Sequence, residues 1–153
     1  MDITNILNRH TESDIAVLLI RLLVGIIFLS EGLQKFIYPA LGPARFAAIG
    51  FPAFTFWAYF VGTTEVLCGA MVIVGFYTRL ASTLLLIDIT VAIMVTKLPI
   101  LLGSGFGPFE VRHLSRYGFW AMMHEARTDF SMFIGTIFML MKGGGKWSLD
   151  LRH

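Results

Sequence analysis

The sequence predicts an all-α fold: an integral membrane bundle of four transmembrane helices, with an interfacial loop between the third and the fourth. Hydrophobic residues make up 56% of the 153-residue chain and charged residues only 14%, whereas a soluble domain carries about a quarter charged residues because its surface faces water. The mean hydropathy is +0.75, and four long apolar stretches alternate with polar or Gly- and Pro-rich segments. We expect a single membrane domain over residues 1–153.

The first two apolar stretches predict spans at about residues 15–36 and 53–76. A helix needs about 20 apolar residues to cross the hydrocarbon core, and both stretches are long enough. Pro39 ends the first span, because proline lacks a backbone donor and clashes with the preceding turn. The connecting segment is rich in Gly, Pro and aromatic residues, and we expect a short interfacial helix within it, at about residues 44–49.

The other two predicted spans cover about residues 80–98 and 120–141; the stretch from Asp129 to Met141 alone is short, so the fourth span is taken to begin near Trp120. The short connection before the third span requires the second and third spans to be antiparallel neighbours, and Pro99 ends the third. Residues 103–127 mix glycines, charges and aromatic residues, which favours an interfacial or re-entrant loop. Four spans place both termini on one side of the membrane, but Arg and Lys are divided between the two sides, so the orientation stays open.

Charge and composition exclude several kinds of partner. The net charge is +2 without a run of like charge, which gives no support to a nucleic-acid partner. Cys68 is the single cysteine and cannot form a disulfide within the chain. The loop residues His113, His124 and Glu125 lack ligand spacing, so we predict no metal site and no covalently bound cofactor. The expected partners are the lipid bilayer and either other subunits of a membrane complex or further copies of this chain.

Charged residues inside the apolar stretches are the strongest functional signal. A charge at the centre of a span costs at least about 2.5–3.5 kcal/mol, so such residues face the bundle interior, pair with one another or line a wet cavity. The candidates for ligand or proton handling are Arg21, Glu31, Lys35, Glu65 and Asp88. Lys97 lies at the end of the third span, and no catalytic residue is assigned.

Depths along the helices predict how these charges pair. A rise of 1.5 Å per residue places Arg21 about 9 Å, Asp88 about 12 Å, Glu65 about 16 Å and Glu31 about 24 Å from the terminal side of the membrane. We therefore expect Arg21 to pair with Asp88. Glu31 and Lys35 are four residues apart on one face, which suits an internal pair. Glu65 is left without a partner, and a carboxyl buried alone favours its neutral form, so Glu65 is the candidate for proton exchange.

Helix faces predict where these charges meet other elements. Gly62, Glu65 and Gly69 share one face of the second span. The first span has a matching stripe, made of Arg21, Gly25, Phe28, Gly32 and Lys35. Small residues on facing stripes predict a close helix contact, or a ligand beside the carboxyl. A purely structural role is the alternative for the charges, because buried ion pairs also fix how helices align.

Five short motifs, in order along about residues 15–150, resemble the DoxX family. They are RLLVG at residues 21–25, EGLQKF at 31–36, EVLCG at 65–69, GFYTRLA at 75–81 and GGGKWSLD at 143–150. The resemblance implies a small inner-membrane protein of four helices, in bacteria. It also implies motif positions at Arg21, Lys35, Glu65, Arg79, Ser148 and Asp150, without assigning catalysis to any of them.

The resemblance and the buried charges leave three classes of function open. The first is a membrane subunit of a quinone-linked oxidoreductase or respiratory complex, with a quinone- or proton-handling site. Donors for a quinone head would come from Arg21, Lys35 and Cys68, beside phenylalanine side chains. The alternatives are a non-enzymatic scaffold that stabilises a larger complex, and a small proton-coupled transporter with Glu65 as its coupling carboxyl.

Overall fold

The chain is helical in the computed structural model, which describes residues 14–152, with side chains placed from 15 to 150; within that range there is no strand. The helices are α2 (Asp14–Ile37), α3 (Pro43–Ile49), α4 (Phe54–Val74), α5 (Thr78–Thr96), α6 (Leu98–Leu102), α7 (Phe119–Glu125), α8 (Arg127–Lys142) and the short 3-10 helix η1 (Leu149–Arg152). The all-α prediction is confirmed. The first three predicted spans correspond to α2, α4 and α5. The short helix predicted between the first two spans corresponds to α3.

Glycines let α2 and α4 pack backbone to backbone. A Cβ added at Gly32 would lie 2.8 Å from the carbonyl oxygen of Gly62, and one added at Gly69 would lie 2.8 Å from the backbone nitrogen of Leu29. A Cβ at Gly25 would lie 2.9 Å from the carbonyl oxygen of Gly69. Such approaches leave no room for a side chain at these positions. The close contact predicted between the two glycine stripes is confirmed.

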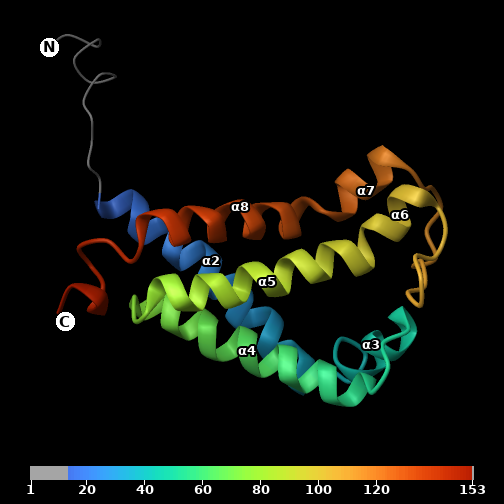
Figure 1. The fold of residues 1–153 in the computed structure, drawn as a ribbon, viewed down its shortest axis with the longest axis horizontal. Helices are drawn as coiled ribbons and strands as arrows, with labels where there is room; N and C mark the ends of the chain where they lie inside the picture. The colour runs from blue at the N-terminus through green and yellow to red at the C-terminus, as the bar shows by residue number, and fades with distance from the viewer. Residues whose placement is uncertain (1–13, 153) are drawn as a thin grey trace, which may run out of the picture.

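A tight turn joins α4 to α5. Gly75 ends α4 with a positive φ of 71°, a conformation that glycine adopts at no steric cost. The backbone N–H groups of Gly75 and Phe76 donate to the last carbonyl oxygens of α4, those of Val72 (3.2 Å) and Met71 (2.9 Å). From this turn α4 and α5 diverge along the bundle, as Figure 1 shows. The predicted antiparallel hairpin is therefore present, and its two arms are splayed.

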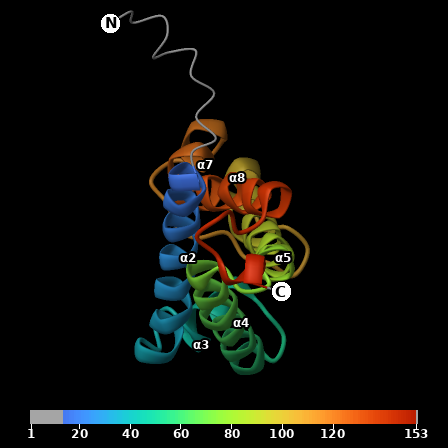
Figure 2. The same ribbon diagram turned by 90° about the vertical axis from the view of Figure 1, so that its left-hand side faces the viewer.

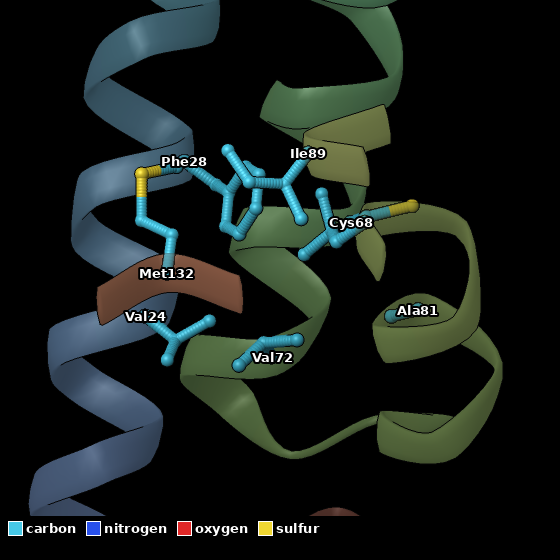
Figure 3. Close-up of a cluster of buried hydrophobic side chains, with 8 residues drawn as sticks. Val24, Phe28, Cys68, Val72, Ala81, Ile89 and Met132 are labelled. Atoms are coloured by element: carbon cyan, nitrogen blue, oxygen red, sulfur yellow. The ribbon is translucent and has the colours of Figure 1, made fainter. Parts of the chain in front are cut away.

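The fourth long helix, α8, packs against α5 and α2 (Figure 2). Side chains from all four helices meet in one buried apolar cluster, in which Figure 3 labels Val24, Phe28, Cys68, Val72, Ala81, Ile89 and Met132. The start of α2, the α4–α5 turn and the C-terminal segment share one end of the bundle, whereas α3, α6 and α7 lie at the other (Figure 1).

The predicted continuous span at 120–141 is wrong. Ala126 has φ −90° and ψ 2°, which separates α7 from α8. The remaining α8 has 16 residues, fewer than the roughly 20 that a span needs. Within the described residues, three helices are long and apolar enough to cross a membrane: Ile15–Ile37, Phe54–Val74 and Thr78–Leu102. Charged partners hold the two sides of the break, since Glu125 pairs with Arg112 and Asp129 pairs with Lys97.

The loop between α6 and α7 is anchored to the bundle by backbone hydrogen bonds. The Glu110 N–H donates to the carbonyl of Ile49 in α3 (2.8 Å), and the Gly118 N–H donates to that of Ile100 in α6 (3.0 Å). A long loop therefore follows the third predicted span, as expected. Its position at the membrane interface stays a prediction.

Candidate functional site

A cavity of about 680 Å³ lies among α2, α3, α4, α5 and α8; we call it the central cavity. Its charged lining consists of Glu31, Lys35, Arg45, Glu65, Asp88, Lys97 and Asp129. The rest of its wall is mainly apolar, with aromatic rings from Phe46, Phe51, Trp57 and Phe60. A volume of roughly 300–1,000 Å³ with an apolar wall and a few converging polar groups is typical of a small-molecule site.

Lys35 and Glu65 form an ion pair across the glycine-packed helices. The Lys35 ammonium donates to Glu65 Oε2 at 2.5 Å, and the two side chains are only 11% and 7% exposed. The same ammonium donates to the backbone carbonyl of Glu31 at 3.3 Å, rather than to its carboxylate. The expectations that Lys35 pairs with the Glu31 carboxylate and that Glu65 stands alone are both wrong.

The direction of helical side chains explains this pair. Side chains lean toward the N-terminus of their own helix. Because α2 and α4 are antiparallel, Lys35 and Glu65 lean toward each other along the helix axes. Gly32 lies between them, and a Cβ there would be 2.9 Å from Glu65 Cβ. The glycine contact therefore brings the two helices close enough for the charges to meet.

Asp88 on α5 completes an inner charge cluster with Lys35 and Glu65. Its carboxyl lines the same cavity and interacts electrostatically with both of these side chains. Glu65 lies ten residues before Gly75, and Asp88 lies eleven residues after Tyr77. With a rise of about 1.5 Å per residue, the hairpin brings the two carboxyls to nearly the same level. That Glu65 and Asp88 lie at the same level could have been predicted from the sequence, because the short connection between the second and third spans was predicted.

The inner charge cluster has one ammonium for two carboxyls, and the Glu31 carboxyl, which lines the same cavity, adds a further acid that interacts electrostatically with Glu65. Two carboxylates held side by side repel each other, and sharing a single proton between them relieves that repulsion. Lys35 can neutralise one negative charge, so the second carboxyl is free to hold a proton. The arrangement can thus bind and release a proton beside an apolar cavity, which is the chemistry expected for Glu65 but distributed over two acids.

A second ion pair closes the cavity toward the α3 end. Lys97 Nζ lies 3.2 Å from Asp129 Oδ2, which joins the end of α5 to the start of α8. Asp129 and Arg45 were not among the predicted site residues. Asp129 lies within the predicted fourth span, and Arg45 lies within the short helix predicted at about residues 44–49. Only the folding of α3 and α8 over the hairpin brings both into the cavity wall.

Arg21 lies outside the central cavity. Its guanidinium donates to the backbone carbonyls of Gly144 and Trp147, both at 2.6 Å, and the residue is only 3% exposed. Its electrostatic partner is Asp150. The predicted pair of Arg21 with Asp88 is therefore wrong, because the C-terminal segment, not α5, reaches the arginine.

Residues 143–150, the closing segment, pack over the α4–α5 turn. The Asp150 N–H donates to the carbonyl of Gly75 at 2.9 Å, and Asp150 Oδ2 accepts from the Thr78 N–H at 3.1 Å. A Cβ added at Gly75 would lie 2.7 Å from Arg21 Nη1, and one at Gly144 would lie 2.6 Å from Ser148 Cβ. Arg21, the turn and the closing segment therefore form one interlocked structural unit.

The comparison with protein families decides what these motifs belong to. The sequence profile of the DoxX family matches residues 16–98, which is more than half of the chain. The chain belongs to the DoxX family. The resemblance predicted from the motifs is confirmed, and with it the assignment as a membrane protein with transmembrane helices.

Two relatives of this DoxX chain are both bacterial. An uncharacterised membrane protein of Mycobacterium tuberculosis is 52% identical over 144 residues, covering 94% of this chain and 84% of the relative. A Bacillus subtilis protein that bears the name of a candidate oxidoreductase, CatD, is 35% identical over 137 residues, covering 90% of this chain and 86% of the relative. No solved structure matches the chain.

The structure divides the DoxX-like motif positions into two groups. Lys35 and Glu65 belong to the central cavity, where a ligand could reach them. Arg21, Ser148 and Asp150 belong to the closing unit at the opposite end of the hairpin. Within the described residues, no three His, Cys, Asp or Glu side chains are grouped so as to hold a metal ion.

Proposed function

We propose that this DoxX chain is a membrane subunit of an oxidoreductase system that binds a quinone in the central cavity and exchanges protons through the inner charge cluster. The observation that carries the proposal is the cavity itself, in which Lys35, Glu65 and Asp88 converge beside an aromatic wall. Charges at bilayer depth are costly, and a functional site is their default explanation.

The side chains around the cavity fit a quinone head. The aromatic rings of Phe46, Trp57 and Phe60 offer apolar faces for a flat ring. Lys35 lines the same cavity, and its ammonium has three N–H donors, of which one can donate a hydrogen bond to a ring carbonyl oxygen. Cys68 and Arg21, the other donors expected from the sequence, lie in the apolar core and in the closing unit.

Each charged group has a defined task in this proposal. A bound quinone supplies two-electron redox chemistry that is coupled to proton uptake. Lys35 would orient the ring by donating to a carbonyl oxygen, while Glu65 and Asp88 would hold one proton at a time, so that the two protons of a two-electron reduction pass through them in turn. The apolar wall excludes bulk water, which strengthens these electrostatic interactions. Electrons would come from a partner protein.

The relatives support the wider setting of the proposal. The oxidoreductase name of the Bacillus subtilis relative favours a redox context, and the bacterial origin of both relatives favours the inner membrane as the location. A chain of 153 residues whose described part groups no metal ligands is better suited to an accessory subunit than to a complete enzyme, so we expect further subunits or copies of the chain beside it.

Purification in mild detergent, followed by mass spectrometry of bound quinones and co-purifying proteins, tests the proposal. We expect quinone to co-purify with the wild-type protein. In the Glu65→Gln, Asp88→Asn double variant, the amount of bound quinone should fall about tenfold. Glu125→Gln is the matched control, because its carboxyl also pairs with a cation but lies outside the central cavity. Equal quinone retention in the double variant and the control would refute the assignment.

A further inference from the structure

The outer edge of the central cavity lies between the splayed arms of the α4–α5 hairpin. Side chains of both helices border the cavity there and remain exposed on the outside of the bundle. We call this set the rim; its members are Trp57 and Phe60 on α4 and Leu84, Ile87 and Val91 on α5. Their exposures range from 39% for Trp57 to 58% for Ile87. Side chains that face both a cavity and the outside mark an opening.

The rim follows one stripe on each arm of the hairpin. Leu84, Ile87 and Val91 are spaced three and four residues apart, so they share one face of α5. Nearer the turn the arms are closed by the buried core residues Val72 and Ala81. The opening therefore lies on the side of Val72 and Ala81 away from the turn, where Figure 1 shows α4 and α5 apart.

No charged side chain belongs to the rim. The charges of the cavity lie on its inner wall, in the inner charge cluster, and toward the α3 end, at Lys97 and Asp129. Both α4 and the α5–α6 segment are long and apolar enough to cross the membrane, so the rim faces hydrocarbon. Apolar groups can enter through an uncharged opening that faces hydrocarbon, whereas ions cannot, because a charge is costly in hydrocarbon.

A different surface leads toward the aqueous side. A second cavity of about 420 Å³ shares Arg45 and Lys97 with the central cavity and is lined also by Glu110, Arg112 and Glu125. Five of the twelve residues that line this second cavity are charged, so it suits water and protons better than the uncharged rim does. The two routes thus differ in charge and share wall residues at the α3 end of the central cavity.

We infer that the rim is a lateral opening through which a lipid-borne ligand enters the central cavity, its polar head at the inner charge cluster and its apolar tail held between α4 and α5. The inference rests on the proposed function and adds the substrate class: a tail-bearing quinone delivered from the bilayer, not a water-soluble one. The tail then leaves the cavity between the rim side chains of α4 and α5.

Two quinones with the same ring test the inference in bilayer nanodiscs: a menaquinone with an isoprenoid tail, and menadione, which has no tail. Ile87→Trp fills the rim. The matched control is Leu80→Trp, which lies on the same face of α5, four residues before Leu84, and is 56% exposed and outside the cavity. Ala48→Trp fills the second cavity instead. Binding of each quinone is measured at equilibrium and as an association rate.

We expect Ile87→Trp to weaken menaquinone binding, or to slow its association, about tenfold, because the larger indole fills the space between α4 and α5 that the tail needs. Menadione binding should stay within about twofold of that of the control. Leu84→Trp, also on the rim, should reproduce the effect if Ile87→Trp does not fold. Slowing by Ala48→Trp but not by the rim variants would overturn the inference and assign the route to the second cavity. Equal losses of both quinones would overturn the tail assignment. If wild type bound neither quinone, the proposed function itself would fail.

Discussion

The Lys35 ammonium on α2 lies 2.5 Å from Glu65 Oε2 on α4, so an ion pair joins the two helices that pack most closely. Asp88 on α5 interacts with both partners. The pair is therefore a structural link between helices and, at the same time, part of the cavity wall.

Removing the cation of this pair should destabilise the protein. Lys35→Met leaves two carboxyls without their shared ammonium, and breaking a buried ion pair by removing one partner costs about 3–5 kcal/mol. Adding Glu65→Gln to the same chain should restore much of that loss. Denaturant unfolding in detergent measures both effects. The control Arg112→Met breaks a pair whose arginine side chain is 74% exposed, and should change stability by about 0–1 kcal/mol. A Lys35→Met protein as stable as wild type would contradict the prediction.

A methyl group at Gly69 should separate α2 from α4. The new Cβ would lie 2.8 Å from the backbone nitrogen of Leu29, which cannot turn aside as a flexible side chain can. We expect Gly69→Ala to lower the free energy of unfolding by about 1–3 kcal/mol through overpacking. Leu33→Ala removes a side chain that is 44% exposed on α2 and serves as the comparison. If the two variants had similar free energies of unfolding, α2 and α4 could move apart without a loss of stability, which would contradict the prediction.

Loss of the Arg21 guanidinium should release the closing segment. Arg21→Met leaves the carbonyls of Gly144 and Trp147 without their donor, and a hydrogen bond to a charged group contributes about 1.5–3 kcal/mol. We expect hydrogen exchange at the Thr78 and Asp150 amides to rise at least about tenfold.

The control for this experiment is Arg116→Met, in the loop before α7. If the arginine instead served the cavity, amide exchange in the closing segment would match that of the control, while quinone binding fell.

Exchanging the charges of the outer ion pair should restore what either single change loses. Lys97→Asp places two carboxylates together between α5 and α8, and Asp129→Lys places two ammonium groups there, since the wild-type atoms are 3.2 Å apart. Like charges in contact repel, so each single variant should unfold at a lower denaturant concentration. The double variant should recover at least about half of the loss, within the usual range of coupling between contacting residues. Additive losses would show that the two side chains do not interact.

The helices and their close contact were predictable because they depend on local patterns. Apolar stretches of sufficient length define α2, α4 and α5, and glycines spaced seven residues apart mark the facing stripes of α2 and α4. Proline and glycine positions define where these helices end. The fourth span was misjudged because its apolar stretch was continued through the polar residues around Ala126, where the helix changes direction.

Charge partners were harder to predict because they depend on how helices are offset. The depth estimates assumed that all helices begin at a common level. Instead, Gly25 of α2 faces Gly69 and Ile73 of α4, so Arg21 lies level with Gly75 at the turn. Asp88, eleven residues beyond Tyr77, is then roughly 16 Å farther along the bundle. An offset of this size cannot be read from the length of an apolar stretch.

The sequence by itself determined that this chain is helical, that its helices are apolar enough for a membrane, and that buried charges are its distinguishing feature. Tertiary structure alone decided which charges meet. The physical reason is range: hydropathy and helix propensity act over a few turns, whereas the pairing of Lys35 with Glu65, and of Arg21 with the closing segment, requires elements 30 and more than 120 residues apart to dock in one register.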